Sequence, residues 1–218
     1  MSAGAGTVRP EVAFIGDLAC PWCHVGFRRF LALRGSMALR LRWHPFMVAP
    51  HLPPTGVPLE RYLERRYGSL ARAAGELRRI EAAGAADGAR FAFWRIRRQP
   101  GTLAAHALLL AIDDEAATVA MAGRLFEAFF HEGSDIGDPA ILRREAEDLG
   151  IAWPAALDPV PVRAAHETAL ALGVEGVPAF IAGGRTLIAG AQPVEVLRGL
   201  VEVACYPGRA SPQGRQAS

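Results

Sequence analysis

The sequence predicts an α/β fold, and three observations in chain order support this. A short apolar run at residues 12–17 has the residue types of a β-strand and leads into Cys20-Pro21-Trp22-Cys23, where a helix can begin. Residues 173–189 predict a loop, a strand, a glycine turn and a second strand. The region between them is dominated by helical patterns. The predicted order is strand, helix, strand, a long helical stretch, helix, hairpin and helix.

The remaining elements follow from local patterns. Alternation of apolar and polar residues over 39–46 predicts the second strand, and the proline-rich segment 47–58 is expected to be an extended link. Helices are predicted over residues 59–67, 70–83, 102–112, 116–132, 138–149, 161–172 and 193–204. The charged residues of the first two are interpreted as solvated surface. The helix at 102–112 is apolar on nearly every side and is expected to be buried, with His106 as a core histidine.

The Cys20-Pro21-Trp22-Cys23 motif carries the chemistry. Pro21 suits the first helical turn, where its missing N–H costs nothing. A thiol at a helix N-terminus faces unpaired backbone N–H groups and the positive end of the helix dipole, which favour the thiolate. Cys20 is therefore the predicted nucleophile. Cys23 lies one turn deeper on the same face, so it can form a disulfide with Cys20 and release a bound substrate.

The residues around the two thiols are expected to tune their redox balance. Pro21 and Trp22 stand between the cysteines, and Trp22 adds mainly apolar surface, which predicts a less oxidising pair that rests largely reduced in a cytosol. His24 could stabilise a thiolate, although a packing or groove-edge role is favoured for it because it points away from Cys23. Zinc binding is an alternative, but a zinc site usually needs a second cysteine pair. The remaining cysteine, Cys205, is interpreted as a structural or incidental thiol.

Five segments together resemble the DsbA-like thioredoxin-fold family, and most closely its FrnE-like cytoplasmic branch. They are Cys20 to Cys23, Trp43-His44-Pro45-Phe46, Asp135-Ile136-Gly137-Asp138, Gly176-Val177-Pro178 and Gly190-Ala191-Gln192-Pro193. The resemblance covers about residues 11–205. It implies a thioredoxin fold, strand-helix-strand and then helix-hairpin-helix, with an inserted all-helical domain. The implied boundaries are 11–57 and 160–205 for the discontinuous thioredoxin-like domain, 58–159 for the insertion, and 1–10 and 206–218 for flexible termini.

The resemblance also implies roles for single residues. Cys20 becomes the attacking and Cys23 the resolving cysteine, and the Val177–Pro178 bond becomes a cis peptide that faces them. Val177 is then expected to pair with an extended substrate segment. One position departs from the family pattern: relatives tend to have Pro-Asn-Thr where this chain has Pro100-Gly101-Thr102, so any role of that asparagine is missing here.

Composition limits the other classes of function. With 218 residues, of which 51% are hydrophobic, the chain can bury a substantial core. The net charge of +2 gives no reason to expect nucleic acid or membrane partners. All 24 basic residues are arginines, which excludes Schiff-base chemistry and a P-loop lysine. Residues 1–10 contain no apolar core of signal-peptide length, so a cytoplasmic location is expected.

The sequence therefore predicts a thiol:disulfide oxidoreductase or isomerase that acts on protein disulfides through the Cys20–Cys23 pair. No cofactor is expected, although glutathione could serve as a thiol partner. The first alternative is a glutathione-dependent transferase or isomerase for small molecules, related to kappa-class glutathione transferases and 2-hydroxychromene-2-carboxylate isomerases. Such relatives typically have serine at the position of Cys20. The second alternative is a non-catalytic thiol-binding or zinc-binding protein, or a holdase.

Overall fold

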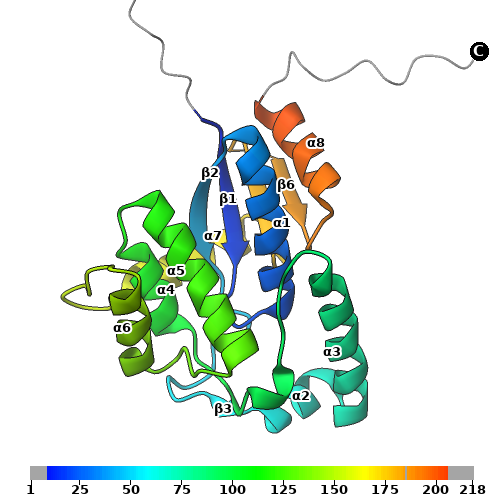
Figure 1. Cartoon of the computed structure of the whole chain (residues 1–218), viewed down its shortest axis with the longest axis vertical. Helices are drawn as coiled ribbons and strands as arrows, with labels where there is room; N and C mark the ends of the chain where they lie inside the picture. The colour runs from blue at the N-terminus through cyan, green and yellow to red at the C-terminus, as the bar shows by residue number, and fades with distance from the viewer. Residues whose placement is uncertain (1–8, 185, 206–218) are drawn as a thin grey trace, which may run out of the picture.

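The computed structural model describes residues 9–184 and 186–205 (Figure 1). A four-stranded sheet in the order β2-β1-β5-β6 lies at its centre. The strands are β1 (Glu11–Gly16), β2 (Arg40–Pro45), β5 (Ala179–Ala182) and β6 (Thr186–Ala189). β1 pairs in parallel with β2 and antiparallel with β5, and β5 pairs antiparallel with β6. Strands from the early and the late part of the sequence therefore both pair with β1.

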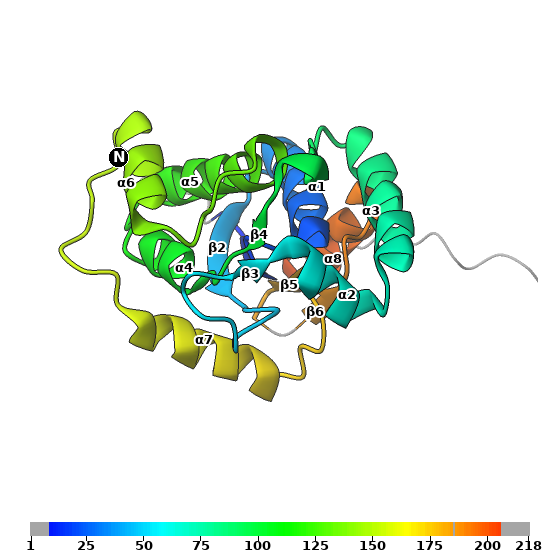
Figure 2. The same ribbon diagram turned by 90° about the horizontal axis from the view of Figure 1, so that it is seen from below.

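Helices cover both faces of this sheet. Figure 2 shows α7 (Pro159–Ala171) on one face, while α1 (Pro21–Met37) and α8 (Val194–Cys205) pack together on the other. α1 joins the parallel strands β1 and β2, because a parallel pair needs a crossover connection. The predicted α/β fold, a thioredoxin fold with a helical insertion, is confirmed.

The middle of the chain is mainly helical. Its helices are α2 (Leu59–Tyr67), α3 (Leu70–Ala85), α4 (Leu103–Leu110), α5 (Glu115–Glu127) and α6 (Pro139–Asp148). In Figure 1, α4, α5 and α6 lie together on one side of the sheet, and α2 and α3 lie on the other side, near α1. No helix within the described residues is both long enough and apolar enough to cross a membrane.

Most of the predicted elements are present with ends shifted by one or two residues, and two features were not predicted. The segment predicted as one helix over 116–132 divides, because α5 ends at Glu127 and a π-helical turn occupies Ala128–Glu132. In addition, a short 3-10 turn, Phe93–Arg95, precedes β4 (Arg98–Gln99), which pairs antiparallel with β3 (Val57–Pro58). Each strand of this ladder has two residues, too few for a recognisable alternation.

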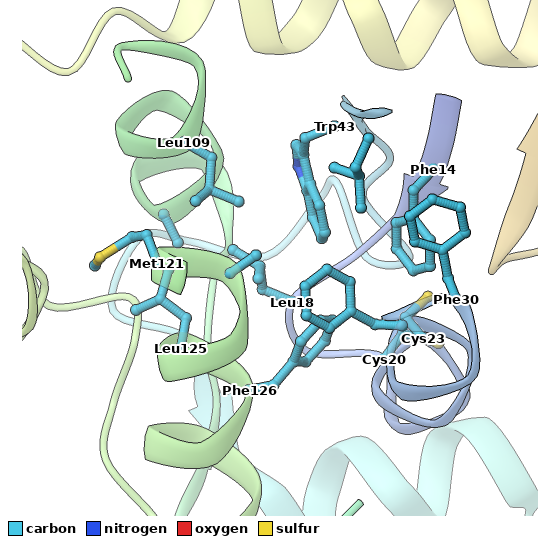
Figure 3. Packing of buried hydrophobic residues seen from close by; sticks show 14 of the residues in the cluster. Phe14, Leu18, Cys20, Cys23, Phe30, Trp43, Leu109, Met121, Leu125 and Phe126 are labelled. Atoms are coloured by element: carbon cyan, nitrogen blue, oxygen red, sulfur yellow. The ribbon is translucent and has the colours of Figure 1, made fainter. Parts of the chain in front are cut away.

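The core is centred on Phe14 of β1. Its ring stacks on Trp43 of β2 with the ring centroids 5.3 Å apart, and it meets Phe27 and Phe180 edge-on. Figure 3 shows how the same cluster continues past Trp43 to side chains of α4 and α5. The boundaries predicted at 57/58 and 159/160 separate the sheet from the insertion in the sequence. The hydrophobic core contains residues of both parts, so it continues across these boundaries. That the two parts are separate domains remains a prediction.

A side chain of the insertion binds the outer edge of the sheet. β2 is an edge strand, and the N–H of Leu41 donates to the carboxylate of Glu115 at 2.8 Å. Arg34 and Arg9 bind the same carboxylate, and Arg9 belongs to the segment 1–10 whose flexibility remains a prediction. The rest of the predicted flexible termini, residues 1–8 and 206–218, lies outside the described residues.

His24 belongs to the core between α1 and the insertion. Its side chain is 1% exposed and its ring stacks on Phe126 and Phe130. Nδ1 has no hydrogen-bond partner among the described residues, and Nε2 lies 3.7 Å from a Glu127 oxygen, beyond hydrogen-bond length. Burial, and then the charge of Arg28, lowers the pKa of His24 to about 3. His24 is therefore neutral at physiological pH and has the packing role, one of the two that the sequence favoured for it.

Replacing His24 with Phe tests this assignment through acid stability. The folded-state pKa of about 3 lies below the unfolded value of roughly 6.5. The neutral imidazole therefore contributes stability that is fully present above pH ~6.5 and is lost as the pH falls towards ~3. Relative to the parent, the free energy of unfolding of His24→Phe should improve by roughly 2 kcal/mol between pH 7.5 and pH 5. Urea unfolding at both pH values measures this. If the free energies of unfolding of His24→Phe and the parent differ by the same amount at both pH values, His24 takes up a proton as readily in the folded protein as in the unfolded chain.

Candidate active site

The two thiols lie where β1 passes into α1. Cys20 is the N-cap residue of α1 and has extended backbone angles, and Pro21 is the first helical residue, as predicted. The backbone oxygen of Cys20 accepts from the N–H groups of Cys23 and His24, at 3.0 and 3.2 Å. Both cysteines are free thiols. The Cys20-Pro21-Trp22-Cys23 motif thus forms the tip and first turn of the helix.

The two cysteines differ in their surroundings. Cys20 is 8% exposed and lies at the wall of a cavity, whereas Cys23 is fully buried. Burial first, and then the neighbouring Cys20 side chain, raises the pKa of the Cys23 thiol well above its ordinary value. The sulfur of Cys23 accepts a hydrogen bond from the Asp17 N–H at 3.5 Å. Cys23 is thus held as a thiol behind Cys20, which suits a residue that reacts second.

The loop before β5 faces Cys20 from the opposite side. The Val177–Pro178 peptide bond is cis, as the resemblance implies. The Cys20 thiol lies 3.8 Å from the carbonyl oxygen of Val177 and can donate to it. Pro178 packs directly on Gly26 of α1, where an added Cβ would lie only 2.6 Å from the proline ring. The structure therefore brings Cys20, Cys23, Val177 and Pro178 together at one place.

Trp22 is held by the insertion. Its indole N–H donates to Glu76 of α3 at 3.2 Å, and the guanidinium of Arg79 lies over its ring at 4.8 Å. Arg79 binds the same Glu76 carboxylate through two hydrogen bonds, which hold the pKa of Glu76 below its usual value. The charges of this helix had been interpreted as surface only. Arg79 is exposed as predicted, but both Glu76 and Arg79 also contact Trp22, the side chain that lies between the cysteines.

A cavity of about 480 Å³ opens beside Cys20. Its walls come from the Cys20 turn, the link after β2, α2, the π-helical turn, α7 and the loop that ends at Val177. Most of the residues that line it were not predicted from the sequence, and these include Tyr62, Arg66, Tyr67, Phe93, Phe129, Phe130 and His166. Aliphatic and aromatic side chains together form most of the wall of a space large enough for a small molecule or an apolar peptide side chain.

Two ionisable side chains in the cavity are kept neutral by their surroundings. Burial raises the pKa of Tyr62 to about 12, so its phenol stays protonated. Burial likewise lowers the pKa of His166. Arg66 and Glu175 also line the cavity and supply one charge of each sign. Arg66 had been predicted to lie on the solvated face of its helix; it is exposed, and it also contributes to the cavity wall.

A close backbone contact explains why residue 101 is glycine, where relatives tend to have asparagine. At Gly101 an added Cβ would lie 2.7 Å from the backbone oxygen of Pro53. Any side chain there would collide with the proline-rich link. The glycine at residue 101 therefore allows the link and the start of α4 to approach each other. Thr102 is buried at the N-cap of α4. This part of the site differs from the family pattern because the backbone itself occupies the space.

Neither Cys205 nor a metal-binding cluster takes part in this site. Cys205 is the last residue of α8 and is not among the residues that line the cavity. Within residues 9–184 and 186–205, no three His, Cys, Asp or Glu side chains come together in a way that could hold a metal ion.

The fold has clear relatives among solved structures. The probable DsbA oxidoreductase of Streptomyces coelicolor is 25% identical, with a TM-score of 0.79 and 96% of this chain and 95% of that chain covered. The cytosolic disulfide reductase DsbM of Pseudomonas aeruginosa is 19% identical, with a TM-score of 0.60 and coverage of 88% and 92%. A 2-hydroxychromene-2-carboxylate isomerase is 17% identical, with a TM-score of 0.63 and coverage of 89% and 96%.

The comparison with family models covers nearly the whole described chain. No curated protein sequence is significantly similar to this one. The model of the DSBA-like thioredoxin domain matches residues 11–202, a range that includes the sheet, the insertion and the site around Cys20. The chain therefore belongs to the family of DSBA-like thioredoxin domains.

Proposed function

We propose that this protein is a thiol:disulfide oxidoreductase of the FrnE-like branch, which acts on protein disulfides in the cytosol through Cys20 and Cys23. One observation carries the proposal: Cys20 is at a helix N-terminus and at the wall of a cavity, and Cys23 is buried one turn behind it. A nucleophile at the wall of a cavity with a shielded resolving thiol behind it is the arrangement that disulfide exchange needs. The family assignment supports the same chemistry.

The reaction follows from this arrangement. The Cys20 thiolate attacks one sulfur of a substrate disulfide, so a Cys20–substrate disulfide forms and the other substrate sulfur leaves as a thiolate that takes up a proton. Cys23 then loses its proton and attacks the Cys20 sulfur. The substrate leaves as its second thiol, and the protein is left with a Cys20–Cys23 disulfide. Two molecules of a small thiol such as glutathione return it to the dithiol state and are themselves oxidised to one disulfide.

The direction of net exchange depends on the residues between the cysteines. Trp22 offers the sulfurs an apolar ring, and its indole N–H is already bound to Glu76, so it is not free to stabilise a thiolate. A pair of moderate potential in a cytosol poised at roughly −220 to −320 mV is largely reduced. We therefore propose that the protein reduces or isomerises disulfides and uses glutathione as electron donor. DsbM, a cytosolic disulfide reductase with a related fold, has a solved structure with GSH.

A second candidate function is supported by the cavity itself. Its volume of about 480 Å³ and its aromatic walls suit a small apolar substrate, and a relative of the same architecture is a 2-hydroxychromene-2-carboxylate isomerase. On this alternative the protein would be a glutathione-dependent transferase or isomerase. The chain has cysteine at position 20, where such relatives typically have serine, and this favours the first candidate. A holdase or a thiol-binding or zinc-binding protein would show no catalytic reduction of a model disulfide.

Replacing Cys23 with Ser separates the two enzymatic candidates. Attack by Cys20 still occurs, but no thiol remains to release the product, so the mixed disulfide should accumulate. We expect Cys23→Ser protein, made in a Cys205→Ser background and purified after acid quenching, to carry several protein adducts that a reductant removes. Non-reducing electrophoresis and mass spectrometry identify them. The matched control is Cys20→Ser in the same background, which should carry none.

Two other results would contradict the proposal in different ways. Adducts of glutathione or another small thiol alone would place the small-molecule function first. A Cys23→Ser protein that remains free under mild oxidation would remove both enzymatic functions and leave the binding protein.

A second experiment tests whether the Val177 loop takes part. In Gly26→Ala the new Cβ would lie 2.6 Å from the Pro178 ring, so the loop must move away from Cys20. Turnover of a protein disulfide should fall by about tenfold or more, as a misplacement of ~1 Å can reduce rates by up to ~10²-fold. The reactivity of Cys20 towards a small alkylating agent should change much less, because that reaction does not need the loop.

Gly35 in the same helix provides the matched control. Nothing lies within 4 Å of a Cβ added there, so Gly35→Ala should keep full activity and gain up to ~1 kcal/mol of stability from helix propensity. Unchanged turnover in Gly26→Ala, with thermal unfolding confirming a folded protein, would show that the loop does not present the substrate.

A further inference from the structure

Arg66 of α2 places a positive charge in the wall of the cavity beside Cys20. Among the described residues, the charged side chains that line this cavity are Arg66 and Glu175, and they belong to different segments. α2 lies near the N-terminal end of α1, where the thiols are (Figures 1 and 2). Most of the remaining wall is apolar, so its few polar groups decide which molecules the cavity binds and in which orientation.

The charge of Arg66 is not neutralised by the protein itself. Within the part of the chain that the structure describes, its guanidinium forms no ion pair. Glu76, whose pKa the charge of Arg66 helps to lower, binds Arg79 and Trp22 instead. The guanidinium of Arg66 lies 5.8 Å from the centre of the Tyr67 ring, which carries no charge to balance it. A positive group at the cavity wall is thus available to a bound molecule.

Tyr62 adds a second donor on the same face of α2. It precedes Arg66 by one helical turn, so the two side chains are neighbours on the helix surface. Both line the cavity that Cys20 also lines. Because burial raises the pKa of Tyr62 to about 12, its phenol keeps its proton and can donate it to a hydrogen bond. A hydroxyl and a guanidinium placed in this way can bind the two oxygens of one carboxylate.

His166 of α7 contributes a third donor to the cavity. Its Nδ1 accepts from the N–H of Met47 at 3.3 Å, so the proton of the neutral imidazole is on Nε2. Burial lowers the pKa of His166, which keeps the ring neutral near pH 7. The described part of the cavity wall offers one carboxylate, that of Glu175. The polar lining is therefore richer in donors than in anions, and it suits a molecule that brings its own negative charge.

We propose that Arg66 and Tyr62 bind a carboxylate close to the reacting sulfur of the substrate, so that the site prefers acidic thiols and disulfides. This inference rests on the proposed disulfide chemistry, because Cys20 must attack the sulfur that the carboxylate accompanies. The attack forms a Cys20–substrate disulfide and releases one acidic thiolate, which takes up a proton. Glutathione and a protein segment with an acidic residue beside its cysteine both have this chemistry.

The test compares two small disulfides of opposite charge, dithiodipropionate and cystamine, which have the same spacer between sulfur and charged group. The second-order rate at which each forms a mixed disulfide with Cys20 is measured in Cys23→Ser, Cys205→Ser protein by acid quenching and mass spectrometry. In this background, Arg66→Gln should lower the ratio of the dithiodipropionate rate to the cystamine rate by roughly fivefold. Tyr62→Phe should lower it by roughly threefold. Taking the ratio cancels any change in the reactivity of Cys20 itself.

Arg65→Gln is the matched control. Arg65 is the neighbouring residue on α2, is exposed and is not among the residues that line the cavity. The substitution removes the same charge, so at an ionic strength of about 0.15 M, which screens distant exposed charges, the ratio should stay within about twofold of the parent value. Equal falls in Arg65→Gln and Arg66→Gln would reveal a general field of the helix and would overturn the inference. An unchanged ratio in Arg66→Gln would overturn it as well.

Two peptide disulfides that differ only in Glu or Gln beside the cysteine identify the source of the carboxylate. If Arg66→Gln also abolishes a preference for the Glu peptide, acidic protein segments are substrates. If only the small disulfides respond, the carboxylate belongs to a small thiol such as glutathione. A parent background that reacts with no disulfide at all would contradict the proposed function itself, whereas one that reacts equally with both charges would contradict only this inference. Circular dichroism confirms that each variant is folded.

Discussion

The geometry of the site depends on the buried carboxylate of Asp17. One oxygen binds the amide of Ala19 and shapes the turn that places Cys20 at the N-cap of α1, and the other binds the amide of Val48 in the link after β2. Val48 and its neighbours form part of the cavity wall. A buried charge without partners costs several kcal/mol. The Asp17 side chain therefore keeps the cysteine turn and this part of the cavity wall in fixed positions relative to each other.

The framework of the molecule could be predicted from its sequence, since strands and helices leave periodic patterns and the two thiols have a recognisable spacing. The cavity could not. Tyr62 and Arg66 share a short amphipathic helix whose polar residues resemble a solvated face, and only the tertiary structure shows that both line the cavity that Cys20 also lines. The π-helical turn that carries Phe129 and Phe130 also left no pattern distinct from that of an α-helix. Both misses arise from contacts between segments that are distant in sequence.

The two buried histidines show the same limit. His24 and His106 both lie in helices and are both nearly inaccessible to solvent. The sequence predicted a core role for His106 and a packing or groove-edge role for His24. Their chemistry differs because their partners differ. His24 is surrounded by phenylalanine rings that offer no hydrogen bond, whereas His106 accepts from Trp43, 63 positions earlier in the chain, and faces a carboxylate. Nothing local to either histidine distinguishes an isolated imidazole from one held in a chain of polar groups.

The thiols and much of the cavity wall come from different parts of the chain. The sheet and α1 hold the thiols and the Val177 loop, while the insertion supplies Glu76, which holds Trp22, and Phe129 and Phe130, which line the cavity. Substitutions in the cavity walls can therefore change the shape and polarity of the space beside Cys20 without moving the sulfurs. His106 also joins the two parts, because it belongs to the insertion and its Nε2 lies 3.4 Å from the carboxylate of Asp17, in the turn before the thiols.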